Sequence, residues 1–198
     1  MTTPEVLFSL PLAEEILESH RYRAGGDDEG FDAYKAHVYR VINFARALSR
    51  DAPERDDKLA IAAAFHDLAA FDTLDYLVPS ILAQDAWLHR AGREAWSDEL
   101  AVVVAEHHRF SRYRAPRPHA ELVEAVRRAD LIDVSQGLIK FGLPSGYVRE
   151  VRGAFDAGVF FTRVIPAGAV RAVRTLQPLG FLRPRDALER SGHLGADR

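Results

Sequence analysis

The sequence contains no cysteine among its 198 residues. This absence excludes disulfide bonds, thiolate nucleophiles and cysteine-based zinc sites, so any bound metal ion must be held by histidine and carboxylate side chains. Long apolar runs are absent too. The longest uninterrupted one extends from Leu59 to Phe65, far short of the roughly 20 residues that span a bilayer. We therefore expect no contact with a membrane.

The sequence also lacks an excess of charge, since 26 lysine and arginine residues face 29 aspartate and glutamate residues, for a net charge of −3. Without a basic excess, we do not expect a nucleic-acid partner. The N-terminus, MTTPEVLFSL, lacks the basic residues that begin a signal peptide, which predicts a cytoplasmic protein. Hydrophobic residues (47%) and charged residues (28%) occur in the proportions of a soluble globular chain.

Apolar residues recur at the helical period through most of the chain, and no convincing alternating strand pattern appears. The predicted fold class is therefore all-α. Ser97 is predicted to be an N-cap, because acidic residues follow it directly. The predicted helices cover residues 7–20, 31–50, 54–70, 79–92, 97–108, 119–140, 147–155 and 166–176.

The length of the chain fits a single domain. We expect residues 1–30 to form an N-terminal helix and loop that pack on the core, and residues 31–140 to form the core itself. Residues 141–178 would add further helices to the same domain. The last segment, 179–198, contains Pro184, Gly192 and Gly195 and is predicted to be a loosely ordered tail.

Several predicted helices place a metal-capable side chain on their apolar face. His37, His66, His107 and Asp130 each lie three or four residues from an apolar residue of the same helix face. A buried carboxylate is costly unless a cation or strong donors meet it. No lysine or arginine occupies the inward face beside Asp67 or Asp130. A divalent metal ion would satisfy the carboxylates and the imidazoles together.

The stretch AAAFHDLAAF places His66 and Asp67 side by side in an alanine-rich helix. Adjacent side chains leave a helix about 100° apart. A cation between those directions can bind the long imidazole and the short carboxylate at once. The small neighbours let other helices come close, so the pair is predicted to be part of a metal site.

These residues resemble the motif series of the HD-domain superfamily of metal-dependent phosphohydrolases. The resemblance rests on His37 in HVYRV, His66–Asp67 in FHDLA, EHH at 106–108 and Asp130 in RRADLID, and covers roughly residues 30–140. It implies an HD-domain helical bundle with a central metal-binding cleft, in which His37, His66, Asp67 and Asp130 are the metal ligands. Imidazole and carboxylate ligands suit Mn, Fe, Co, Ni or Zn, whereas Mg is a poorer match.

Three departures from the superfamily's patterns narrow the activity. HDLAAF lacks the Glu-Asp pair that follows the HD motif in stringent-response hydrolases. HHRFSRYR lacks the Gly-Tyr-Pro motif of the cyclic-di-GMP phosphodiesterases. Ala70 occupies the position of the catalytic glutamate of the mononuclear deoxynucleotidases. The group that transfers protons must therefore differ here or be absent.

Further histidines are candidates for a second metal ion. His107 and His108 are additional ligands, phosphate donors or buried hydrogen-bonding residues. His89 lies where dinuclear members of the superfamily supply a ligand, but a surface histidine near a helix end is the commoner outcome for such a residue.

Three acids are candidate catalytic residues. Asp67 would orient a water molecule. Asp133, on the face of Asp130, would orient a ligand or a water, or cap a neighbouring helix. Asp72 would line the cleft, unless it serves only the turn after the HD motif.

Four arginines are candidate substrate-binding residues, because the planar guanidinium donates two parallel hydrogen bonds to phosphate. The first lies one turn after His37, and the others follow the paired histidines in a loop. The alternative for that loop is a solvated basic surface. The candidates are Arg40, Arg109, Arg112 and Arg114, with His107 and His108 as further phosphate donors.

Together these features predict a metal-dependent phosphohydrolase that acts on a phosphomonoester or phosphodiester of a nucleotide-like small molecule. One alternative is a di-iron oxygenase on the same scaffold, and another is a catalytically degenerate HD domain that only binds. The sequence leaves open whether the chain forms a homo-oligomer.

Overall fold

The computed structural model describes residues 4–73, 75–156, 158–159 and 183–193. No strand occurs in these residues, so the all-α prediction is confirmed. None of the described helices is both long and apolar enough to cross a bilayer. The predicted helix at 166–176 lies outside the described residues. The helices are α1 (Pro11–Ser19), α2 (Asp28–Leu48), α3 (Arg55–Phe65), α4 (Leu77–Arg90), the short 3₁₀ helix η1 (Glu94–Trp96), α5 (Ser97–Glu106), α6 (Ala120–Val134), α7 (Ser145–Ala154) and α9 (Pro184–Arg190).

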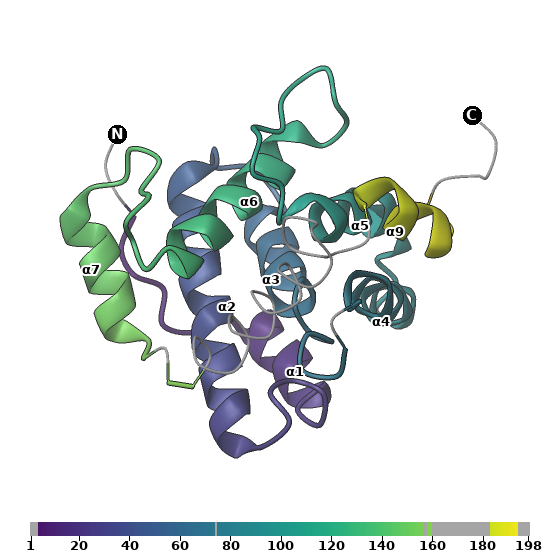
Figure 1. Cartoon of the computed structure of the whole chain (residues 1–198), viewed down its shortest axis with the longest axis horizontal. Coiled ribbons are helices and arrows are strands. Elements are labelled where there is room, and N and C mark those ends of the chain that lie inside the picture. The colour runs from purple at the N-terminus through teal and green to yellow at the C-terminus, as the bar shows by residue number, and fades with distance from the viewer. Residues whose placement is uncertain (1–3, 74, 157, 160–182, 194–198) are drawn as a thin grey trace, which may run out of the picture.

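Helix α3 lies at the centre of the bundle and contacts α1, α2, α4, α5 and α6 (Figure 1). Every residue from Leu59 to Phe65 is buried, and four of these seven residues are alanine. Small side chains at a contact let helix axes come close together. The alanine-rich run therefore allows the surrounding helices to bring their polar side chains to one point.

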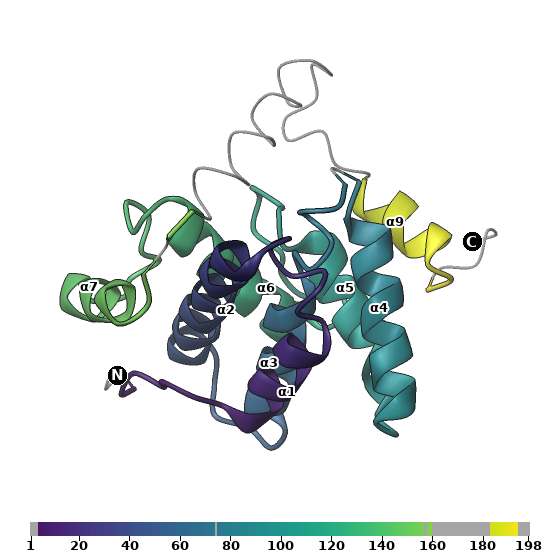
Figure 2. The ribbon, with the colours of Figure 1, turned by 90° about the horizontal axis from the view of Figure 1, so that it is seen from below.

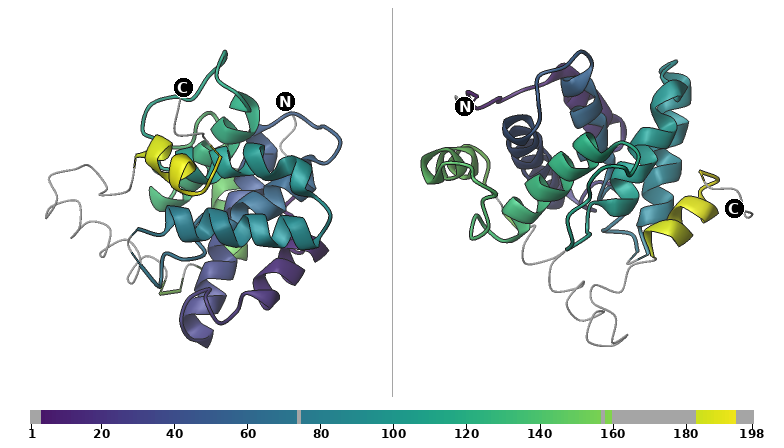
Figure 3. Two further views of the ribbon diagram at one scale, coloured as in Figure 1. Left: turned by 90° about the vertical axis from the view of Figure 1, so that its right-hand side faces the viewer. Right: turned by 90° about the horizontal axis from the view of Figure 1, so that it is seen from above.

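Helix α2 is the longest helix, with 21 residues, and packs along α6 and α3. Its start is capped by Asp27, whose side chain accepts a hydrogen bond of 2.7 Å from the backbone N–H of Gly30. Helix α7 covers the outer side of α2, and α9 packs on α4 and α5 at the opposite edge (Figures 2 and 3).

Two helices end earlier than the periodicity predicted, and both ends matter for the site. Helix α3 stops at Phe65 rather than near residue 70, and a turn follows in which the N–H of Ala70 donates to the carbonyl of Asp67. Helix α5 stops at Glu106, so His107 is its C-cap. The turns that follow both helices are buried as well, so the apolar pattern continues past each helix end. The periodicity of the sequence does not distinguish such a buried turn from a further turn of helix.

Other helix ends differ from the prediction for local reasons. Ser97 is not an N-cap, because η1 runs directly into α5 and places Ser97 inside the helix. Helix α6 ends at Val134 rather than near residue 140. There Gly137, at φ 78°, donates its N–H to the carbonyl of Ile132, a turn that requires a left-handed residue.

The predicted loose tail contains a packed helix. Helix α9 buries Ala187 and Leu188 against its neighbours. After it, His193 lies between two acids: Nε2 is 2.7 Å from Oδ2 of Asp85 on α4, and Nδ1 is 2.9 Å from Oδ1 of Asp98 on α5. Seven helical residues were too few to predict from periodicity, and the acids that hold His193 are about 100 residues away in the sequence.

The two acids raise the pKa of His193 to about 9, chiefly through the hydrogen bond with Asp85. A raised folded-state pKa means that the ion pairs stabilise the fold fully below the unfolded pKa of about 6.5 and lose their effect as the pH rises through about 9. We predict that His193→Gln lowers the free energy of unfolding by about 0.2–1 kcal/mol at pH 6, since the pairs are partly exposed. Urea unfolding at several pH values should show the difference from wild type disappearing by about pH 10. A difference that does not change with pH would contradict this assignment.

Candidate metal centre

Four polar side chains from α2, α6 and the turn after α3 converge inside the bundle. They are His37, His66, Asp67 and Asp130, and one ligand atom of each lies within 4.8 Å of the others. None of the four is more than 3% exposed. The Nε2 atoms of the two histidines are 3.0 Å apart, and carboxylate oxygens of both acids lie 3.6–3.9 Å from these nitrogens. The structure thus brings together the four residues that the sequence selected.

Hydrogen bonds at the far side of each imidazole define where its lone pair points. Nδ1 of His37 is 2.7 Å from Oδ2 of Asp133, and Nδ1 of His66 is 2.8 Å from the carbonyl oxygen of Ala63. Both partners are acceptors, which assigns the proton to Nδ1 and leaves a lone pair on Nε2. The two lone pairs then face each other across 3.0 Å. Such an arrangement is repulsive unless a cation or a proton lies between them.

Burial decides the charges of the cluster. Desolvation lowers the pKa of His66 to about 3, so its imidazole is neutral near neutral pH. Burial raises the pKa of Asp130 to about 7, and its Oδ1 has no hydrogen-bond partner among the described residues. Burial also acts to raise the pKa of Asp67, but the adjoining imidazoles of His66 and His107, the second through a hydrogen bond, hold that pKa well below its usual value. A buried carboxylate oxygen without a donor calls for a cation.

The ends of two helices add to the negative potential. Helix α3 ends immediately before His66, and α5 ends immediately before His107. The last carbonyl groups of a helix carry partial negative charge and favour a cation nearby. Two imidazole nitrogens and two carboxylates around one point are also a donor set that suits a divalent transition metal. The residues present therefore fit a divalent ion.

A second group of donors shares one carboxylate with the first. Asp67, His107 and His108 also bring one ligand atom each to within 4.8 Å of one another. Nε2 of His107 lies 3.2 Å from Oδ1 of Asp67, while its Nδ1 faces the carbonyl of Val104 at 2.6 Å. His108 is the most exposed of the three, with 20% of its side chain accessible. Both paired histidines thus face the same centre.

Tyr76, directly before α4, is a residue of this centre that the sequence patterns did not select. Its hydroxyl shares a hydrogen bond with Nε2 of His108, and the residue is only 4% exposed. Burial and the nearby charge of Asp67 raise the pKa of Tyr76 well above its usual value, so the phenol keeps its proton at neutral pH. In the sequence a tyrosine beside Leu77 and Val78 reads as an ordinary core residue, so no pattern distinguishes it.

Arg40 has a different place from the one predicted, whereas Asp133 orients the candidate ligand His37, one of the roles expected of it. Arg40 is 1% exposed and donates from Nε and a terminal nitrogen to the two oxygens of Asp133, at 2.6 and 2.9 Å. Its other terminal nitrogen donates to the carbonyl of Phe155. Asp133 in turn accepts from His37. Both residues lie behind His37, a candidate metal ligand, and hold it in position, so neither is placed to contact a substrate.

Three more candidates lie away from the cluster. His89 is exposed on α4 and belongs to neither donor group. Asp72 is exposed and pairs with Arg23 at 3.2 Å, as a turn residue would. Arg109 donates to Glu106 at 3.0 Å, at the end of its own helix. The turn after α3 carries Asp72 away from the cluster, and the loop after α5 does the same for Arg109. The direction of a loop is not encoded in residue spacing.

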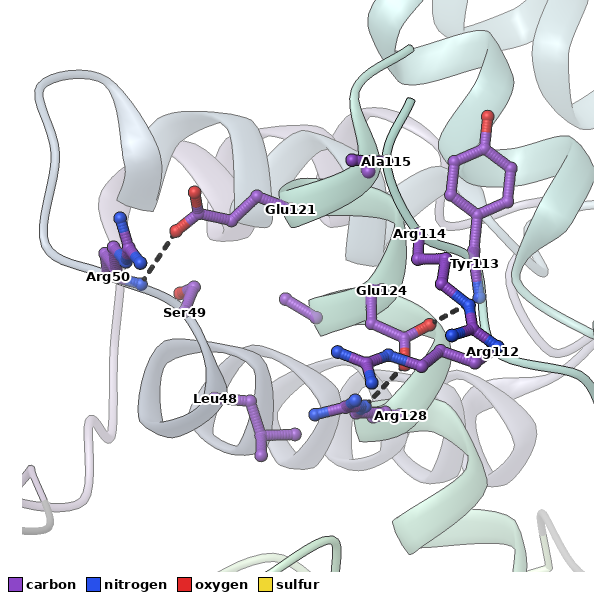
Figure 4. A pocket seen from close by; sticks show the side chains of 12 residues that line it. Leu48, Ser49, Arg50, Arg112, Tyr113, Arg114, Ala115, Glu121, Glu124 and Arg128 are labelled. Atoms are coloured by element: carbon purple, nitrogen blue, oxygen red, sulfur yellow. Dashed lines mark hydrogen bonds and ion pairs between the residues drawn. The ribbon is translucent and has the colours of Figure 1, made fainter. Parts of the chain in front are cut away.

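Arg112 and Arg114 line a separate cavity, between the loop after α5, the end of α2 and the outer face of α6 (Figure 4). Eleven residues separate His37 from Leu48, the α2 residue at this cavity, which corresponds to about 16 Å along the helix. On α6, Arg128 precedes Asp130 by two residues, so their side chains leave the helix about 200° apart. The structure therefore places Arg112 and Arg114 at a cavity other than the metal centre, and their contact with a substrate at that centre stays a prediction.

Comparison with known protein families gives one match. Residues 34–135, a little over half of the chain, match the family model described as "HD domain". No curated protein and no solved structure matches the chain.

Proposed function

The chain belongs to the HD-domain family, and on that premise we propose that it is a metal-dependent phosphohydrolase acting on a phosphomonoester or phosphodiester of a nucleotide-like small molecule. The observation that carries the proposal is the pair of facing Nε2 lone pairs beside an unpartnered carboxylate oxygen of Asp130. His37, His66, Asp67 and Asp130 would hold the ion. A bound divalent ion polarises a phosphoryl oxygen and lowers the pKa of water toward neutrality.

The residues around the ion have distinct tasks. Asp67, which belongs to both donor groups, is placed to orient an attacking water. His108 is the more exposed of the paired histidines and would contact the incoming phosphate. Tyr76 keeps its phenolic proton and would donate a hydrogen bond to the leaving oxygen. Ala70, which occupies the position of the catalytic glutamate of the mononuclear deoxynucleotidases, has no acid for this task.

We predict that Tyr76→Phe lowers kcat by about 100-fold for an alkyl phosphate, the lower end of what a positioned proton donor contributes. Metal content should not change. The loss should be much smaller for p-nitrophenyl phosphate, because its leaving group needs no proton. Tyr147→Phe is the matched control, since it removes one buried hydroxyl that bonds only to the carbonyl of Asn43. Equal losses for the two substrates would show that Tyr76 merely holds His108.

The second donor group supports one alternative. If His107 and His108 hold a second ion that shares Asp67, the same scaffold suits a di-iron oxygenase. Counting metal ions per chain after aerobic purification and testing for oxygen consumption separates the two activities. One ion per chain with phosphoester hydrolysis supports the phosphohydrolase. A protein that binds no divalent ion would instead be a degenerate HD domain that acts by binding alone.

The experiment that tests the proposal is a screen of phosphorylated metabolites against protein reconstituted with Mn, Fe, Co, Ni or Zn, with release of phosphate or of a monoester as the signal. Hydrolysis that depends on the metal and disappears with a chelator is the expected result. Full metal occupancy without hydrolysis of any phosphomonoester or phosphodiester would overturn the proposal.

A further inference from the structure

The cavity beside α6 has an unusual balance of charge. Six of its lining residues are charged, and four of them are cations: Arg50, Arg112, Arg114 and Arg128 against Glu121 and Glu124. Figure 4 shows the guanidinium groups of Arg112, Arg114 and Arg128 gathered around the single carboxylate of Glu124. Like charges this close repel one another, so the cavity as it stands favours an anion.

The carboxylate of Glu124 is already saturated. Its Oε2 accepts from the backbone N–H of Tyr113 at 2.9 Å and from Nε of Arg127 at 2.8 Å. Its Oε1 accepts from a terminal nitrogen of Arg127 at 3.0 Å and from Nε of Arg128 at 2.6 Å. Glu124 therefore pairs with the two arginines of its own helix, whose summed charge exceeds its own. It has no further lone pair in good geometry for the arginines of the loop.

Arg112 and Arg114 consequently keep their donors unused. Both are exposed, and neither guanidinium makes a hydrogen bond or ion pair with another residue in the described part of the chain. Each guanidinium carries five N–H donors in a planar fork that matches the oxygens of a phosphate. Two such groups on one loop, opposite Arg128 on α6, can hold a dianion from both sides.

We propose that this cavity is a second binding site, which takes the phosphate group of a small organic phosphate and is independent of the metal centre. Its volume of about 500 Å³ lies within the range of small-molecule sites. Leu48, Ala120 and Ala125 supply an apolar wall for the organic part of the ligand. The net charge of −3 favours a small molecule over a nucleic-acid backbone.

The site cannot be a subsite for the ligand of the metal centre. Arg128 and Asp130 point to nearly opposite sides of α6. Glu124 and Ala125 line the cavity from the face that Arg128 occupies. A ligand small enough for this cavity therefore does not reach His37, His66 or Asp130 through the helix.

Isothermal titration with inorganic phosphate and pyrophosphate tests the proposal on the full chain carrying Asp67→Asn, in metal-free buffer at fixed ionic strength. Without a bound metal ion that protein is not expected to hydrolyse either probe, so the result does not depend on whether the chain hydrolyses phosphoesters. We expect pyrophosphate to bind. Adding Arg112→Gln and Arg114→Gln should weaken its affinity at least tenfold. Both positions are exposed, and the thermal midpoint should stay the same.

The matched control adds Arg90→Gln and Arg149→Gln instead, two exposed arginines that do not line the cavity. This control removes the same charge and should bind pyrophosphate as the parent does. Equal affinity in the Arg112/Arg114 variant, equal weakening in the control, or no binding of either probe would each overturn the proposal. Tight binding of a mixed-sequence oligonucleotide without binding of pyrophosphate would overturn it in favour of a nucleic-acid surface.

Discussion

Replacing Asp67 with asparagine is expected to empty the metal centre and to abolish hydrolysis. Asp67 is the one residue that belongs to both donor groups, and it is 3% exposed between the imidazoles of His66 and His107. Asparagine keeps the size of the side chain but removes the negative charge that balances the cation. Loss of even an outer partner of a metal ligand costs 10–100-fold in affinity, so loss of a charged ligand should cost at least about 100-fold.

Metal content by mass spectrometry and the thermal midpoint with and without metal report this result independently of activity. Metal at about 100 times its dissociation constant stabilises the wild type by about 2.7 kcal/mol, and this gain should be missing in the variant. The control is Asp72→Asn, an equally conservative change at an exposed aspartate of the same turn. A variant with Asp67→Asn that kept full metal and full activity would remove Asp67 from the site altogether.

Replacing Asp133 with leucine is expected to destabilise the fold more than any other single substitution at the metal centre. Asp133 is 0% exposed and accepts hydrogen bonds from Arg40 and His37. Burial acts to raise the pKa of Asp133, but these two partners hold that pKa below its usual value, so the residue is a carboxylate at neutral pH. Removing it breaks the buried pair that Asp133 forms with two nitrogens of Arg40, and breaking such a pair typically costs about 3–5 kcal/mol.

Urea unfolding of the metal-free protein measures this loss. The double variant Arg40→Met/Asp133→Leu is the decisive comparison, because it removes both members of the buried pair, whereas the single variant keeps the guanidinium. It should be more stable than Asp133→Leu despite carrying one more substitution. Metal affinity should fall in both, since His37 loses the acceptor that orients its ring. If the double variant is less stable than the single one, the two residues do not form an ion pair in solution.

Periodicity is a property of single helices, so the sequence could predict that the four candidate ligands lie on buried faces and meet. His37, His66 and Asp130 each interrupt an apolar face at a helical spacing, and a buried polar residue needs a partner. Asp67 was selected because it is adjacent to His66 in the sequence. The relative placement of the helices was not needed, since all buried faces of a small bundle meet at its centre.

The remaining site residues depend on information that spacing does not contain. Arg40 shares a face with His37, but its long side chain bends back to Asp133 rather than toward the cluster. Arg112 lies close to the paired histidines in sequence, yet the loop carries it to another cavity. Tyr76 joins the centre through its hydroxyl, which meets His108 in a contact across 32 residues.

Anomalous diffraction from crystals of the protein reconstituted with Mn²⁺ tests the metal centre most directly. We expect an anomalous peak between Nε2 of His37, Nε2 of His66 and the carboxylates of Asp67 and Asp130. A weaker or equal second peak beside His107 and His108 would identify a second ion on the same Asp67. Protein that takes up Mn²⁺ but shows no peak among these four residues, or shows a peak only at the surface, would contradict their assignment as metal ligands.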